Sequence, residues 1–181
     1  MTSAAEVKTK WGIDTTHSEV QFKTKHLVIS TVTGSFKKFS GSVESDNESD
    51  FDNARVEFSI DVDSIDTNQA DRDAHLKSPD FFSAEEYPSI DFRGQLKKIS
   101  GNDYKLAGPL TIRGTTRNVE LSVEFGGIVK DPWGNIKAGF ELNGKINRKD
   151  FGLSWNALTE TGGLVVAEEV RIHINVELSK S

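Results

Sequence analysis

The sequence contains no cysteine, which excludes disulfide bridges, thiolate nucleophiles and cysteine-ligated zinc or iron–sulfur sites. Basic residues are in deficit, because 22 Lys and Arg stand against 28 Asp and Glu, for a formal net charge of −6. A nucleic-acid-binding protein needs a surplus of Lys and Arg on one face, so this balance argues against a nucleic-acid partner. No apolar run approaches the roughly 18 residues of a membrane-spanning helix, so we expect no integral membrane segment.

Residues 1–10 contain no apolar segment of the kind found in a secretory signal peptide. We therefore expect a cytoplasmic protein, or a periplasmic one if a leader has been removed from the chain. A length of 181 residues predicts one domain. We assign residues 11–181 to this domain and residues 1–10 to an N-terminal tail.

Apolar and polar residues alternate over much of the remaining sequence. The clearest runs are residues 55–62, 118–125 and 170–178, where every second residue is Val, Ile, Leu or Phe. This alternation is typical of antiparallel strands with one buried and one solvated face. About eight or nine such strands are expected, and they must hide their apolar faces by closing into a barrel or by packing as a sandwich. The sequence therefore predicts an all-β fold.

Two short segments interrupt the alternation. Residues 68–77 predict a short helix, because Thr67 or Asn68 can cap its N-terminus and acidic residues fill its first turns. Ser78 and Pro79 fit the N-cap and the first position of a second helical segment. We expect both segments to cover one end of the barrel.

The residues that could carry catalysis do not form a recognisable catalytic set. Asp71 and His75 are four residues apart on the predicted helix and could hold one edge of a metal site, but we favour a local hydrogen bond. Ser18 follows His17 directly, and adjacent residues of an extended chain point to opposite faces. We expect no catalytic residue, no metal and no cofactor. The disfavoured alternative is a small-molecule hydrolase that uses His17 or His75.

The alternation does not decide what fills the interior. Barrels of about eight strands lie at the size at which side chains can either fill the centre or leave room for one elongated ligand. A structural or partner-binding barrel with a filled core therefore stays open beside a ligand-binding barrel.

A series of short motifs runs along the chain in fixed order. The most specific is R-D-x-H-L-x-S-x-D-F-F at residues 72–82. The others lie at residues 11–14, 17–22, 34–36, 39–41, 64–67, 87–90, 108–114, 147–152 and 160–163. With these motifs, residues 11 to 178 resemble the YceI family of lipocalin-like, polyisoprenoid-binding proteins.

The resemblance implies a lipocalin-like, extended antiparallel β-barrel of about eight strands with one or two short helices at an end. It also implies a long apolar channel for an isoprenoid or similar lipid tail, and frequent homodimers. Many members carry a signal peptide and are periplasmic, and the first ten residues here differ from that pattern. The family is not regarded as enzymatic, so we expect non-enzymatic binding, transport or sequestration of an amphiphilic lipid of polyisoprenoid, quinone or fatty-acyl type. A role in stress response is a further expectation.

The strand faces and the motifs then give candidate site residues. We expect the channel to be lined by Phe22, Phe58, Ile60, Phe92, Leu121, Val123, Phe140 and Leu142. Aromatic residues outside the strands are expected to plug its ends: Phe81, Phe82, Phe151 and Trp155. Three cations within motifs are candidate contacts for a lipid head group, or else partners in structural salt bridges: Arg72, Arg113 and Arg148.

Overall fold

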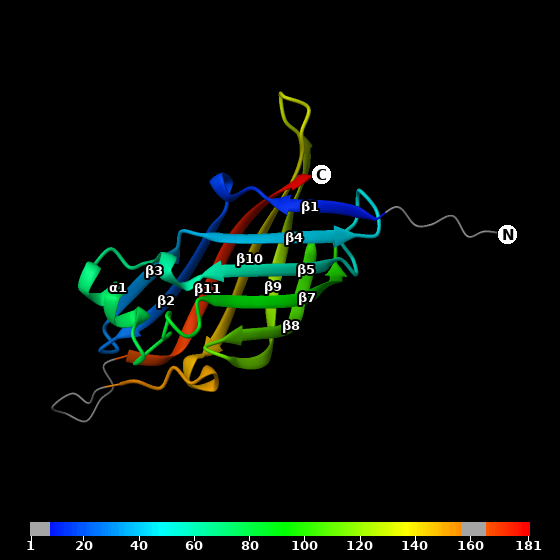
Figure 1. The fold of residues 1–181 in the computed structure, drawn as a ribbon. Helices are drawn as coiled ribbons and strands as arrows, with labels where there is room; N and C mark the ends of the chain where they lie inside the picture. The colour runs from blue at the N-terminus through cyan, green and yellow to red at the C-terminus, as the bar shows by residue number, and fades with distance from the viewer. Residues whose placement is uncertain (1–7, 157–165) are drawn as a thin grey trace.

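Eleven strands form one continuous antiparallel sheet in the computed structural model, which describes residues 8–156 and 166–181 (Figure 1). In chain order they are β1 (Thr9–Ile13), β2 (Glu19–His26), β3 (Ser30–Phe36), β4 (Phe39–Ser45), β5 (Arg55–Asp61), β6 (Ile65–Asp66), β7 (Ser89–Ser100), β8 (Asp103–Ile112), β9 (Thr115–Lys130), β10 (Ile136–Asn147) and β11 (Val166–Lys180). The described residues include one α-helix, α1 (Ala70–Lys77), and three short 3-10 helices: η1 (Thr15–His17), η2 (Val62–Ser64) and η3 (Arg148–Phe151).

Eight of the strands close into a barrel. Their order around it is β1-β4-β5-β7-β8-β9-β10-β11, and β1 completes the ring because it pairs with both β4 and β11. Trp11 lies opposite Val43 on one side and opposite Lys180 on the other. The predicted all-β, antiparallel barrel of about eight strands is confirmed.

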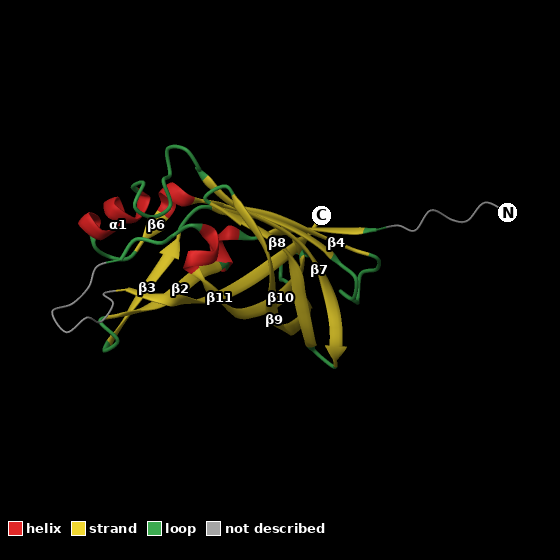
Figure 2. Cartoon of the chain, turned by 90° about the horizontal axis from the view of Figure 1, so that it is seen from below, coloured by secondary structure: helices red, strands yellow, loops and turns green. Residues whose placement is uncertain are grey.

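The other three strands extend the sheet beyond the barrel. The C-terminal part of β11 pairs with β1, whereas its N-terminal part pairs with β2, so β1 and β2 follow one another along the same edge. The turn at η1 separates them, and Asp14 N donates to Glu177 O at 2.8 Å there. Strands β3 and β6 continue the sheet outward from β2, and α1 lies at this end of the molecule (Figures 1 and 2).

Cross-strand pairing places the alternating apolar residues on one side of the sheet. Phe58 of β5 lies opposite Phe92 of β7, and Ile60 lies opposite Ile90. Along β7 the buried residues Ile90 and Phe92 alternate with the exposed Asp91. Because the side-chain period of a strand is two, this register directs all four apolar residues into the barrel.

The helical segment is shorter than expected. Helix α1 begins at Ala70, because Gln69 provides the cap and its side-chain oxygen accepts from Arg72 N at 2.6 Å. The expected second helix does not form, and turns follow α1 instead. Ser78 ends α1, and its hydroxyl donates to His75 O at 2.6 Å and accepts from Asp80 N at 3.3 Å.

Strand β1 begins at Thr9, which lies opposite Ser45 of β4. No helix in the described ranges is long and apolar enough to cross a membrane.

Candidate ligand-binding channel

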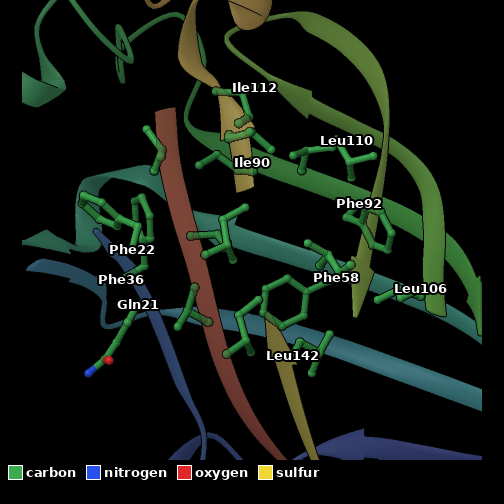
Figure 3. A pocket seen from close by; sticks show the side chains of 18 of the residues that line it. Gln21, Phe22, Phe36, Phe58, Ile90, Phe92, Leu106, Leu110, Ile112 and Leu142 are labelled. Atoms are coloured by element: carbon green, nitrogen blue, oxygen red, sulfur yellow. The ribbon is translucent and has the colours of Figure 1, made fainter. Parts of the chain in front are cut away.

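A cavity of about 220 Å³ lies inside the barrel (Figure 3). Strands all around the ring contribute to its wall, together with Leu76 of α1 and the turns that follow it. The lining is apolar except for Gln21, Thr24 and Arg148. All eight residues expected to line the channel do so: Phe22, Phe58, Ile60, Phe92, Leu121, Val123, Phe140 and Leu142.

The three polar residues of the lining offer little to a polar ligand. The amide of Gln21 points away from the surrounding apolar side chains in Figure 3. The hydroxyl of Thr24 donates to Glu169 O at 3.2 Å. Arg148 bonds to backbone carbonyls, as described below. The interior is therefore suited to hydrocarbon.

One end of the cavity is closed by an aromatic cluster that the sequence did not indicate. Phe51 lies in the loop between β4 and β5 and is 0% exposed. Its ring centroid is 5.2 Å from that of Trp11, 5.4 Å from Phe125 and 4.8 Å from Phe140. The cavity lining includes Phe140 but not the other three, so the cavity ends at this cluster. Phe51 was missed because it stands within a polar, Ser- and Asp-rich segment that is typical of an exposed loop.

Hydrogen bonds hold this loop in place. Trp11 Nε1 donates to Ser45 Oγ at 3.2 Å, and Ser45 Oγ donates in turn to Asn47 O at 2.6 Å. Tyr104 donates its hydroxyl to Asp50 Oδ1 at 3.2 Å, and burial together with the charge of Asp50 raises the pKa of Tyr104. The loop is thus attached to β1, β4 and β8.

The opposite end is bordered by a second group of aromatic rings. Phe36 packs against Phe22 and Phe82, with centroid distances of 5.5 Å and 6.1 Å. Of the four residues expected to plug the channel ends, Phe81 and Phe82 line the cavity. Trp155 lies behind them and packs against Phe81 at 5.3 Å. The fourth, Phe151, is buried outside the lining.

Among the candidate head-group cations, Arg148 alone reaches the cavity. It is 3% exposed, and this burial lowers its pKa. Four of its five N–H donors have backbone acceptors, at distances of 2.9, 2.5, 2.8 and 3.2 Å: Ala167 O, Leu153 O, Trp155 O and Val166 O. Arg148 therefore joins η3 to the start of β11.

The other two arginines also bond to the backbone. Arg72 donates to Thr67 Oγ1 at 2.7 Å and to Thr67 O at 2.6 Å. Arg113 donates to Gly152 O at 2.8 Å and to Pro79 O at 2.9 Å. Both residues hold turns around the mouth of the barrel in place.

The two histidines considered for catalysis lie outside the cavity lining. His75 Nε2 is 2.9 Å from Asp80 Oδ2, so its partner is this aspartate of the following turn and not Asp71. His17 Nδ1 is 2.9 Å from Asp14 Oδ2, whereas Ser18 Oγ donates to Asp14 O at 2.7 Å. No Ser–His pair forms there.

His17 belongs to a small charged cluster at the junction of β1 and β2. Its Nδ1 is also 3.2 Å from Glu177 Oε2, and the bond to Asp14, with the two carboxylate charges, raises the pKa of His17. Hydrogen bonds from Thr16, His17 and Lys137 lower the pKa of Asp14. Asp14, His17 and Glu177 each offer a ligand atom within 4.8 Å of the others and could hold a metal ion. The Lys137 ammonium, 3.2 Å from Asp14 Oδ2, already supplies a positive charge there.

The sequence pattern of the YceI-like domain matches residues 11–178, nearly the whole chain. The chain belongs to the YceI-like family. A UPF0312 protein of Staphylococcus epidermidis is 38% identical over 172 residues, covering 94% of this chain and 98% of the relative. The crystal structure of a Campylobacter jejuni YceI protein is 32% identical, with a TM-score of 0.72 and coverage of 100% and 99% of the two chains.

A more distant structure has the same fold. The polyisoprenoid binding domain from Saccharophagus degradans, implicated in plant cell wall breakdown, is 14% identical, with a TM-score of 0.71. It covers 94% of this chain and 98% of its own. At this identity the likeness extends to the fold alone.

The motif at residues 72–82, on which the resemblance chiefly rested, has a structural role in this chain. Asp73 Oδ1 accepts from Thr67 N at 2.8 Å and from Thr67 Oγ1 at 2.5 Å, which fixes the start of α1. Phe81 and Phe82 at the end of the motif face the cavity. The motif at residues 160–163 lies outside the described residues.

Proposed function

We propose that this protein binds the hydrocarbon tail of an amphiphilic lipid of polyisoprenoid, quinone or fatty-acyl type inside its barrel. The observation that carries the proposal is the apolar cavity of about 220 Å³. Each buried methylene contributes about 0.8 kcal/mol, so a single long tail recovers enough free energy to offset its ordering. The cavity also argues against the alternative of a fully packed core.

An unfilled cavity of this size is costly. At about 24 cal/mol per Å³, as measured when core side chains are removed, the cavity of about 220 Å³ corresponds to about 5 kcal/mol. A guest that fills it would stabilise the folded protein. We therefore expect the protein to retain lipid from its host cells during purification.

Non-enzymatic carriage or sequestration suits this interior better than catalysis. Arg148 is the sole titratable residue among the described lining residues, and its donors face backbone carbonyls. A structural neighbour of the same fold is described as a polyisoprenoid binding domain, and a guest of this class is proposed here by analogy of fold alone. Transport, a role in stress response and homodimer formation are proposed from the family resemblance alone, and the compartment, cytoplasmic or periplasmic, stays the expectation stated above.

Organic extraction of the purified protein, followed by mass spectrometry, tests the proposal. The lipid-free protein should then bind a fluorescent fatty acid, and an unlabelled polyprenyl phosphate, quinone or fatty acid should displace it to different extents. A stable protein that is lipid-free as purified and binds none of these compounds would contradict the proposal. Hydrolysis of small esters that is lost in His17→Ala or His75→Ala would favour the enzymatic alternative.

A further inference from the structure

The turn between β2 and β3 exposes three consecutive apolar side chains. Leu27 is 38% exposed, Val28 77% and Ile29 85%. Among the described residues, half of the six large hydrophobic side chains that are exposed lie in this turn. Single exposed apolar residues are ordinary, whereas a contiguous group marks an interaction surface.

The backbone of the turn is unusual for its sequence. Leu27 has φ 53° and Val28 has φ 66°, both in the left-handed region. The turn has three residues, since His26 pairs with Ser30, and a positive φ favours Gly or Asn because a side chain, and above all a β-branched one, is strained there. Backbone positions strained in this way cluster at functional sites. The turn thus holds apolar side chains in solvent at a cost in stability.

The hairpin that carries this turn is basic. Residues 22–36, which span most of the hairpin, contain Lys23, Lys25 and His26 but no acidic residue, although the whole chain carries a net charge of −6. Phe22 and Thr24 line the cavity, so the exposed Lys23 and Lys25 project from the opposite face of β2. Lys25 Nζ donates to Thr31 Oγ1 across the hairpin at 3.0 Å.

The turn stands beside the mouth of the cavity. His26, at the end of β2, pairs with Val166 of β11, and Val166 lines the cavity. Thr24 pairs with Val170, which also lines it. In Figure 1 this hairpin lies at the α1 end of the molecule, far from the turn between β9 and β10.

We propose that the β2–β3 turn is a membrane anchor that inserts Leu27, Val28 and Ile29 into the interface of an anionic bilayer. Lys23 and Lys25 lie against the lipid phosphates, since apolar insertion combined with basic charge is how peripheral proteins hold such surfaces. In this orientation the mouth of the cavity faces the bilayer. The functional reason for docking depends on the proposed function, lipid binding. Attachment to the bilayer itself does not require a lipid in the cavity.

Sedimentation with lipid vesicles tests the proposal. The protein should bind vesicles of three parts phosphatidylcholine to one part phosphatidylglycerol more strongly than vesicles of phosphatidylcholine alone. The double variant Val28→Ser, Ile29→Ser should lower the partition coefficient about tenfold. The double variant Lys23→Gln, Lys25→Gln should remove the preference for phosphatidylglycerol and the sensitivity to salt.

Trp133 provides a matched control, because it is 83% exposed in the turn between β9 and β10. Trp133→Ser should leave vesicle binding unchanged. The proposal is overturned if the wild-type protein binds neither vesicle, if Trp133→Ser causes the loss, or if the serine double variant binds as the wild type does. A serine double variant that turns a dimer into a monomer without altering vesicle binding would instead make the turn a contact between two copies of this chain.

A second measurement uses the absence of cysteine. In Ile29→Cys the introduced thiol can be labelled with an environment-sensitive dye, whose emission should shift to the blue when anionic vesicles are added. The same label in Ile99→Cys, an exposed position near the end of β7, should not shift. Titration of the serine double variant with a fluorescent fatty acid, without vesicles, separates the two proposals: unchanged affinity shows that only docking is lost.

Discussion

The ring of Phe51 meets the ring of Phe140 edge-on, with centroids 4.8 Å apart and planes at 87°. Phe51 comes from the loop between β4 and β5, whereas Phe140 comes from β10 on another part of the ring. Their contact closes the barrel at the end away from α1. We infer a blind channel, which a lipid tail enters from the α1 end.

Removal of this plug should have a large effect on stability. Phe51→Ala deletes a fully buried ring, so we expect the free energy of unfolding to fall by about 3–5 kcal/mol. The new space should also lengthen the channel and shift the preference toward longer fatty acids. Urea denaturation and displacement titrations measure the two effects. The exposed Trp133→Ala serves as control, and a loss below about 1 kcal/mol would mean that the loop is not a plug.

Two neighbouring residues of β10 allow a matched test of the cavity. Leu142 lines the cavity and Glu141 is exposed. Leu142→Trp should fill space that the guest needs and lower the affinity for a fluorescent fatty acid about tenfold or more, at the cost of modest overpacking. Glu141→Trp adds the same ring outside the barrel and should leave the affinity unchanged. Equal affinities in both variants would place the guest elsewhere.

Arg148 should prove important for stability. Arg148→Met removes the donors to four backbone carbonyls, and we expect a loss of at least about 3 kcal/mol in the free energy of unfolding. Arg148→Lys should restore little, because an ammonium cannot reproduce the planar fork of a guanidinium. Arg93→Met, at a side chain that is 80% exposed, is the control and should change stability by less than about 0.5 kcal/mol. Full stability of Arg148→Met would show that water can replace the guanidinium.

The cluster at the junction of β1 and β2 predicts a pH dependence. The pKa of His17 is raised above 6.5, so its contribution is complete below that pH and is lost as the pH rises through the raised value. The pKa of Asp14 is lowered from 3.8, so its contribution is complete above that pH and is lost on strong acidification. The junction, which also contains Glu177 and Lys137, should thus be most stable between about pH 4 and about pH 6.5.

Urea denaturation from about pH 5 to about pH 9 checks the histidine part of this prediction. His17→Gln should flatten the decline in stability on the alkaline side. The variant His75→Gln, at the other end of the barrel, serves as the comparison. An NMR titration of the His17 ring gives the direction of its pKa independently. A His17 pKa below 6.5 would refute the assignment of the Asp14 and Glu177 contacts.

The sequence alone determined which residues face the interior. The alternation around Phe58 and Phe92 specifies two-faced strands, and all eight residues chosen on that basis line the cavity. The period-two pattern is a local property, and a shift of one residue would turn the whole apolar set to solvent. The family motifs extended this to a closed barrel with a helix at one end.

Only the tertiary structure decided whether the interior is hollow and where it ends. The volume left inside a barrel is the enclosed volume minus the summed volume of the side chains that point inward. The register between strands that are distant in sequence sets that difference. The plug residue Phe51 lies in a polar loop, and the strained, exposed Val28 lies in the turn after β2. The role of Phe51 depends on which distant strands surround it, and no local pattern records that.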